Sequence, residues 1–275
     1  MENTHCLNCN QHLTHTQKFC SNCGQVASTH RFTIASFFHE GFHAVTHADK
    51  GLFYLLKELL LRPGLVAREF IEGKRKKYFN PFTFFLLLMA LFVFVGTFVS
   101  HDNAKQTIPV GITKIKDPKV RETTIIQYQR AMAAKDFFTK RGNLVAMFAI
   151  PFFALFYWLI YYRRPYNYSE HLVANLMFVT FANLAFTLIV FPLQGILRGT
   201  PWENLINLVG FLLQAFYYTI AYKGFVQLKG FWPVAKLAFF SLLAIILWVM
   251  LSTSAIAIYV VRNLHFYEYF THMGR

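Results

Sequence analysis

The chain has 275 residues, of which 55% are hydrophobic and only 15% are charged, and phenylalanine alone contributes 32. A soluble domain carries about 25% charged residues, because polar groups must cover its surface. With 4 Cys, 14 Gly and 9 Pro, the composition also excludes a disulfide-rich scaffold, a collagen-like chain and a disordered chain. We therefore expect an integral membrane protein.

All four cysteines lie near the N-terminus as two Cys-x-x-Cys pairs, Cys6 with Cys9 and Cys20 with Cys23. Each pair forms a turn that directs two thiolates at one point, and two pairs give the tetrahedral four-sulfur set that Zn²⁺ prefers. Two disulfides would need an oxidising compartment, and the polar N-terminal residues give no secretion signal. We expect one structural Zn²⁺ in a zinc ribbon of residues 1–30, which is too small to build a core without metal.

A metalloprotease-like string, His39-Glu40-Gly41-Phe42-His43, follows the ribbon. On a helix it would place two imidazoles one turn apart, with Glu40 as the base for a metal-bound water. Two observations weigh against it. Histidines are concentrated in this part of the chain, which makes a chance match easier, and Gly41 weakens a helix by about 1 kcal/mol relative to Ala. The polar face of a surface helix explains the same residues.

Residues 31–80 are expected to form short amphipathic helices at the membrane surface. Apolar residues recur at helical spacing over residues 34–45, and a second helix is predicted over residues 51–62. Pro63-Gly64 ends that helix, and a third short helix follows. None is long enough to cross a bilayer. They therefore lie in the interface plane or pack onto the protein's own cytosolic loops, and the sequence favours neither arrangement.

A basic block of Lys74, Arg75, Lys76 and Lys77 ends this region. Such a block next to a membrane span binds anionic lipid headgroups or simply fixes the topology, and both interpretations stay open. Nucleic acid is not an expected partner. The net charge of +14 is spread along the whole chain, and no aromatic residues alternate with basic ones as in a nucleic-acid-binding surface.

Five segments contain no Asp, Glu, Lys, Arg or His, and each is long enough to cross a hydrocarbon core of about 30 Å as a helix. Only a helix satisfies the backbone of such a span. The fold class expected is thus an all-α integral membrane protein, with a five-helix transmembrane bundle in residues 81–275. The spans are predicted at residues 82–99, 144–162, 172–196, 205–222 and 237–261.

Residues 100–143 are predicted to form an outer loop that contains a helix. Lys and Arg near the span ends are almost equally divided between the two sides, so they do not decide the orientation. The basic block and the reduced cysteines favour a cytoplasmic N-terminus. The expected location is therefore the inner (cytoplasmic) membrane, with the C-terminus outside.

Ser169-Glu170-His171 stands at the start of the third predicted span. Neighbours in sequence do not form a catalytic triad, and Glu170 near a helix N-terminus favourably complements the helix dipole. The predicted spans themselves contain no ionisable residue, which argues against ion-coupled transport. A pathway for a neutral solute or a lipid stays open.

Five motifs follow one another in the N-terminal part of the chain: Phe19–Gln25, Asp49–Leu52, Arg62–Gly64, Arg68–Tyr78 and Asn80-Pro81. Together they resemble the bacterial family called domain of unknown function 3667, over about residues 1–100. This resemblance implies a zinc-ribbon membrane protein with no established activity, so it transfers no catalytic residue.

We expect a non-enzymatic scaffold or recruitment protein at the inner leaflet. Its partners would be the bilayer, anionic headgroups and an unidentified protein, and self-association is left open. The alternative is a transporter or lipid-handling protein. A membrane metalloprotease that uses His39, Glu40 and His43 is the third hypothesis.

Overall fold

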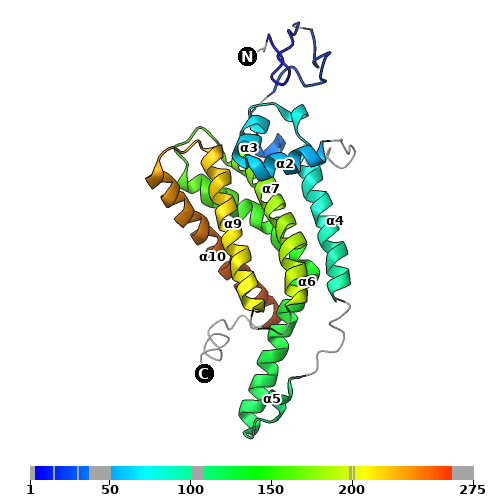
Figure 1. Cartoon of the computed structure of the whole chain (residues 1–275), viewed down its shortest axis with the longest axis vertical. Coiled ribbons are helices and arrows are strands. Elements are labelled where there is room, and N and C mark those ends of the chain that lie inside the picture. The colour runs from blue at the N-terminus through cyan, green and yellow to red at the C-terminus, as the bar shows by residue number, and fades with distance from the viewer. Residues whose placement is uncertain are drawn as a thin grey trace. The chain divides into compact units, whose positions relative to one another are not determined.

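The computed structural model describes residues 4–14, 16–29, 31–36, 51–100, 108–197, 200 and 202–261. These residues form helices, turns and two isolated bridges, with no extended strand among them. The all-α class is therefore confirmed for the described part of the chain (Figure 1). The chain divides into two compact units, Met1–Met89 with Ala146–Ile245, and Ala90–Val145 with Ile246–Arg275.

Two short helices follow the N-terminal segment, α2 (Leu52–Leu61) and α3 (Pro63–Ile71). Arg62 ends the first helix and precedes the second. Pro63 occupies the first position of α3, where its missing N–H removes no helical hydrogen bond. The predicted break at Pro63-Gly64 is confirmed, and it lets two helices of about 10 residues turn sharply against each other.

The remaining helices are longer and mostly apolar. Tyr168 begins a stretch in which an α-helix passes into a π-helical turn and back to a short α-helix, in which Pro192 is the second residue. The elements are α4 (Pro81–Ser100), α5 (Val110–Thr113), α6 (Pro118–Ile160), α7 (Tyr168–Ala185), η4 (Phe186–Val190), α8 (Phe191–Ile196), α9 (Glu203–Phe225) and α10 (Phe231–Val261).

Three helical stretches in the described residues are long and apolar enough to cross a membrane: Tyr168–Val190, Leu205–Phe225 and Phe231–Ile258. They correspond to the third, fourth and fifth predicted spans. The first predicted span coincides with α4, and the second with the shorter apolar helix Leu144–Ile160 within α6. That those two also cross the bilayer stays a prediction, and so does the five-helix transmembrane bundle.

The helix expected within residues 100–143 is present, and it is continuous with the second predicted span. α6 runs without interruption from Pro118 to Ile160, so most of the predicted loop and the second span form one helix of 43 residues. The side chain of Asp117 starts this helix by accepting a hydrogen bond from the backbone N–H of Lys119 at 2.9 Å. Absence of charge marks where a span begins, but it does not mark where a helix begins, because backbone hydrogen bonds continue through polar residues.

α3 packs directly on α9 and α7 (Figure 1). At the crossing, a Cβ added to Gly64 would lie 2.3 Å from both the carbonyl oxygen of Ala221 and the amide nitrogen of Phe225. Gly224 lies opposite Gly64, so the two backbones touch. α3 is therefore packed closely on two of the long helices.

α2 keeps an apolar edge that no other described element covers. Leu55 and Leu59 are buried, whereas Phe53 is 83% exposed and Leu60 and Leu61 are also exposed. Residues 53, 60 and 61 share one helical face. The exposed edge of α2 is compatible with the membrane-surface expectation, which stays a prediction for both helices.

Candidate metal centre and its docking on the helices

The four cysteines of the ribbon (residues 1–30) converge on one point. The Sγ atoms of Cys6 and Cys23 lie 3.5 Å apart and those of Cys9 and Cys20 lie 3.6 Å apart. All four sulfurs are within 4.8 Å of one another. A disulfide needs about 2.05 Å. Thiolates around a tetrahedral metal at about 2.3 Å stand roughly 3.8 Å apart. The four cysteines are thus compatible with metal binding.

Two similar hairpins create this convergence. In each, the amide of the first cysteine donates to the carbonyl five residues later, at 2.8 Å for Cys6 and 2.7 Å for Cys20. The fourth residue after that cysteine has a left-handed backbone, with φ of 62° at Asn10 and 71° at Gly24. Glycine adopts this conformation without strain and asparagine tolerates it. Asn10 and Gly24 are therefore counterparts in the two hairpins.

The ribbon has almost no apolar interior. Among the ribbon residues that the structure describes, Leu13 is the one buried hydrophobic residue besides Cys6 and Cys20, and Ala27 packs against them. So small a core does not offset the chain entropy of a folded segment. A bound metal would supply the missing stability, since metal binding and folding are coupled in such segments.

The thiols differ in acidity according to their surroundings. A hydrogen bond from the Gln11 backbone lowers the pKa of Cys9 to about 6. Burial raises the pKa of Cys6 to about 11. A divalent cation replaces the protons on both, because the thiolate is the form that binds metal.

The ribbon is attached to the end of α3 by a buried amide and a glycine. Gln25 is 2% exposed, and its Oε1 accepts a hydrogen bond from the backbone N–H of Lys76 at 2.9 Å. Gly73 has a φ of 110°, and a Cβ there would lie 2.6 Å from Thr29 Oγ1 and 2.8 Å from Leu7 Cδ1. Ribbon atoms therefore fill the space that a side chain at position 73 would need.

The segment after the ribbon is fixed to the start of α7. Arg31 makes a two-pronged ion pair with Glu170, with Nε 2.7 Å from Oε1 and Nη2 2.8 Å from Oε2, and Nη2 also donates to the carbonyl of Pro165. The side chain of Asn167 donates to the carbonyl of Phe32 at 3.1 Å. Paired hydrogen bonds between a guanidinium and a carboxylate are strong and directional. They hold the segment that leads away from the ribbon.

Glu170 also starts α7. Its carboxylate accepts a hydrogen bond from the Asn167 backbone at 2.7 Å, and the Asn167 side chain accepts one from the Glu170 backbone at 2.9 Å. This reciprocal capping box confirms that Glu170 acts at a helix N-terminus. The sequence missed its partner Arg31, because the two residues are 139 positions apart.

The basic block is folded back on Glu69. Lys74 Nζ lies 3.0 Å from Glu69 Oε1, and Lys77 Nζ lies 2.6 Å from Oε2. Tyr78 donates its hydroxyl to the same Oε2 at 2.5 Å. Burial opposes the charged form of Glu69, but the hydrogen bonds from Lys77, Tyr78 and Lys74 outweigh it and lower its pKa to about 2. Glu69 is therefore a fixed anion beneath the block.

The other two residues of the block face different surroundings. The guanidinium of Arg75 stacks on the ring of Phe32, 4.0 Å from its centroid. The side chain of Lys76 is exposed. Three of the four cations thus have partners inside the protein, which the sequence did not indicate. Binding of lipid headgroups by Lys74–Lys77 stays a prediction, and Lys76 is the member best placed for it.

Residues 49–93 match the model of one protein family. The family is Protein of unknown function (DUF3667). This match confirms the resemblance predicted from the motifs around α2, α3 and the basic block. No curated protein and no solved structure matches the chain.

The matched segment of this family contains the residues that hold the ribbon. Gly73 and Lys76 contact it directly, and Gly64 places α3 on α9. The cysteines themselves lie outside the matched residues. The family match therefore covers residues that contact the ribbon, and it does not cover the candidate metal ligands.

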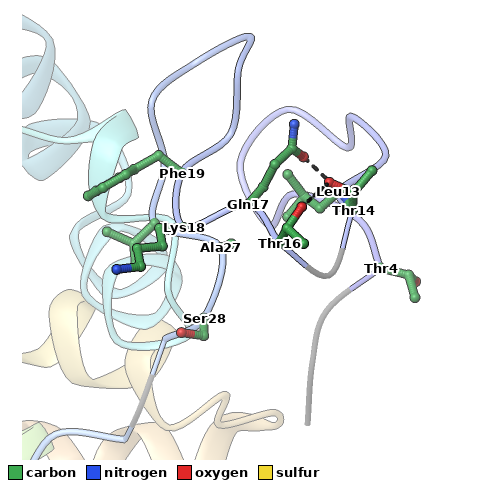
Figure 2. A pocket seen from close by; sticks show the side chains of 10 residues that line it. Thr4, Leu13, Thr14, Thr16, Gln17, Lys18, Phe19, Ala27 and Ser28 are labelled. Atoms are coloured by element: carbon green, nitrogen blue, oxygen red, sulfur yellow. Dashed lines mark hydrogen bonds between the residues drawn. The ribbon is translucent and has the colours of Figure 1, made fainter.

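The ribbon has a hollow of about 540 Å³ on its surface (Figure 2). Hydroxyl-bearing threonines, among them Thr14, line one part of it, and Lys18, Phe19 and Val26 line another. Phe19 is 60% exposed. The backbone N–H of Thr14 donates to Gln17 Oε1 at 3.1 Å, which fixes one wall. The described ribbon residues include no carboxylate, so Lys18 is the one charged residue among the neutral polar and apolar side chains that line the hollow.

A polar cluster is buried between α7 and α9. His171, Asn175 and Tyr222 are 0% exposed. Asn175 Nδ2 donates to the hydroxyl of Tyr222 and to the carbonyl of His171, and His171 Nδ1 lies 3.4 Å from the same hydroxyl. Within the described residues, His171 Nε2 and Asn175 Oδ1 have no hydrogen-bond partner. Such atoms are costly when buried and often mark bound water or ligand.

This cluster corrects one expectation from the sequence. The third membrane-type stretch begins at Tyr168, four residues before the predicted start, because the capping box at Asn167 fixes the first turn. It therefore includes Glu170 and His171, two ionisable residues. They do not form a triad, since the carboxylate binds Arg31 whereas the imidazole faces Tyr222.

The metalloprotease-like string falls outside the described residues. His39, Glu40 and His43 are all in the segment 37–50, for which no placement is described. Whether the two imidazoles converge is not tested, and the enzyme hypothesis rests on the sequence alone.

Proposed function

We propose that this chain is a non-enzymatic membrane protein whose zinc ribbon recruits a partner protein to the inner leaflet of the cytoplasmic membrane. The docked ribbon supports this proposal most directly. Its four thiols leave no position for a substrate if all bind one Zn²⁺, so the metal would serve folding and not turnover. Gln25 and Arg31 fix the ribbon to the helices, as a platform for a partner requires.

The hollow on the ribbon is the proposed contact surface. Phe19 and Val26 offer exposed apolar area, and Lys18 offers the only charge. Because the described ribbon lacks carboxylates and the whole chain carries +14, an acidic segment with an apolar side chain is the complementary partner. None of the residues that dock the ribbon on α3 lines this hollow, so a partner would not displace the docking contacts.

The proposed orientation places the N-terminus in the cytoplasm and the C-terminus outside. Free thiols in the ribbon suit a reducing compartment. The exposed apolar edge of α2 suits contact with acyl chains, and the exposed cation Lys76 suits contact with anionic headgroups. Both features would then lie at the inner leaflet.

Purification in mild detergent, with protein and lipid analysis of the same sample, tests the function. We expect one stoichiometric partner protein, lost in Lys18→Glu, because the charge reversal repels an acidic segment. Gln11→Glu places a carboxylate elsewhere on the ribbon, although it changes the net charge by one unit and not two, and it should retain the partner. Zinc analysis should give one Zn²⁺ per chain in both variants and none in Cys20→Ser. Equal retention of the partner by Lys18→Glu would contradict the proposed surface.

A transporter or lipid-handling protein is the second candidate. The unpaired polar atoms of His171 and Asn175 favour it, because a polar solute or lipid headgroup could satisfy them. A small molecule or lipid that co-purifies with wild type and is lost in Asn175→Leu would support this function. The metalloprotease that uses His39, Glu40 and His43 stays third.

A further inference from the structure

The first hairpin of the ribbon places two histidines opposite each other, with their rings nearly perpendicular at 85°. His5 and His12 form an isolated antiparallel bridge. The flanking hydrogen bonds run from Cys6 N to Gln11 O and from Leu13 N to Thr4 O, so the histidines themselves form a non-hydrogen-bonded pair. In such a pair the Cα atoms are only about 4.5 Å apart and the side chains are closest. The two ring centroids are 5.4 Å apart.

The pair points away from the cysteine cluster. Successive side chains alternate between the two faces of an extended segment. Cys6 and Leu13 are buried in the ribbon core, whereas their neighbours His5 and His12 are exposed. The imidazoles therefore occupy a separate, solvent-facing surface.

The second hairpin shows that the fold does not require histidine here. Phe19 and Val26 form the equivalent bridge, with the same pattern of flanking hydrogen bonds. An aromatic and an aliphatic side chain thus satisfy the same geometry. The presence of two imidazoles at His5 and His12 is a chemical difference between two otherwise similar hairpins.

We propose that His5 and His12 form a second metal site, for a borderline transition-metal cation such as Ni²⁺, Cu²⁺ or Zn²⁺. Imidazole suits these ions. Thr4 Oγ1 lies 3.2 Å from His5 Nδ1. A hydrogen bond there orients the ring and leaves Nε2 for the metal, as a neighbouring polar group commonly does for a ligating histidine. Two protein ligands leave other positions open, so the site binds exchangeable metal, unlike a closed four-thiolate site.

The test uses the full-length, zinc-loaded protein in detergent and Ni²⁺ as the probe. Equilibrium dialysis with metal analysis should find one Ni²⁺ per chain while the zinc content stays unchanged. His5→Ala and His12→Ala should each weaken Ni²⁺ binding by more than about tenfold, since even the loss of an outer-shell partner costs about 10- to 100-fold. Thr4→Val should weaken it less.

Two further variants keep the result interpretable. The double substitution His5→Phe with His12→Val copies the second hairpin, so it removes both ligands and retains a side-chain pair that the ribbon already uses. It should keep the zinc and lose the Ni²⁺. His39→Ala with His43→Ala should leave Ni²⁺ binding unchanged. Ni²⁺ binding that survives the Phe/Val variant, or disappears only with His39 and His43, would overturn the proposal.

Discussion

At the scale of single residues, Gln25 joins two parts of the N-terminal region. Its backbone carbonyl accepts from Cys20 in the cysteine cluster, at 2.7 Å, and its side-chain oxygen accepts from Lys76, at 2.9 Å. One buried residue thus links the candidate metal centre to the basic block. A buried polar group of this kind costs stability when its partner is removed.

Gln25→Leu should detach the ribbon from α3 while leaving the thiols in place. The Lys76 amide loses its acceptor, at a cost of about 1–3 kcal/mol. Hydrogen exchange should then accelerate at that amide by about tenfold or more. Zinc content should not change. Gln11→Leu, at an exposed position of the first hairpin, is the matched control and should be silent. Unchanged exchange at Lys76 would mean that the contact does not hold the ribbon.

Glu69 makes the turn of the basic block sensitive to acid. Its pKa is lowered from 4.5 to about 2. A carboxyl group whose pKa is lower in the folded state stabilises the fold at pH values above its unfolded-state pKa. This stabilisation is lost as the pH falls through its folded-state pKa. We therefore expect the Arg75–Lys77 turn to lose hydrogen-exchange protection between about pH 4.5 and pH 2. In Glu69→Gln the protection should already be low at pH 7 and should vary little over that range. A wild-type pH profile as flat as that of the variant would contradict this role.

At the scale of elements, α3 is the connection between the ribbon and the long helices. Its N-terminal turn touches α9 through Gly64, and the residue after its C-terminal end, Gly73, touches the ribbon. Neither position leaves room for a side chain. The short helix therefore fixes the ribbon through close backbone contacts and not through a large apolar area.

Gly64→Ala should be strongly destabilising. The added Cβ would lie 2.3 Å from backbone atoms of α9, which have no rotamer by which to move aside. Overpacking typically costs about 1–3 kcal/mol, and we expect the upper end, measured as thermal unfolding in detergent. Gly111→Ala is the control, because a Cβ there meets nothing within 4 Å. It should be neutral or slightly stabilising, since Ala favours helix by about 1 kcal/mol. Equal effects of the two substitutions would refute the close contact.

At the scale of the whole molecule, the open question is how many helices cross the bilayer. Three stretches meet the length and composition of a span, and α4 and the apolar part of α6 coincide with the other two predicted spans. An odd number of crossings places the termini on opposite sides. The proposed recruitment function requires the ribbon on the cytoplasmic side.

Labelling of introduced cysteines tests this topology. A membrane-impermeant thiol reagent applied to intact cells should modify a cysteine introduced at Thr107, and it should not modify one introduced at Tyr166. The two positions lie on opposite sides of the second predicted span. After the cells are opened, both should react, which controls for accessibility. Labelling of position 166 alone in intact cells would invert the orientation and place the ribbon outside.

The sequence by itself determined the features that depend on nearby residues. The absence of charge over about 20 residues identified apolar helices, because a helix rises 1.5 Å per residue and a bilayer has a fixed thickness. The short spacing of Cys6, Cys9, Cys20 and Cys23 predicted their convergence. Pro63-Gly64 marked a helix break for a similar local reason. In each case the relevant neighbours are within one turn or one hairpin.

Only the tertiary structure decided what those elements contact. Lys76 meets Gln25 across 51 residues, and Arg31 meets Glu170 across 139. No periodicity or spacing specifies such a pair, since it depends on how α3 and α7 pack. The same packing buried His171 beside Tyr222 and placed Gly64 on α9. Local patterns fix elements through backbone hydrogen bonding and hydrophobicity, whereas long-range pairs form only when the elements are packed together.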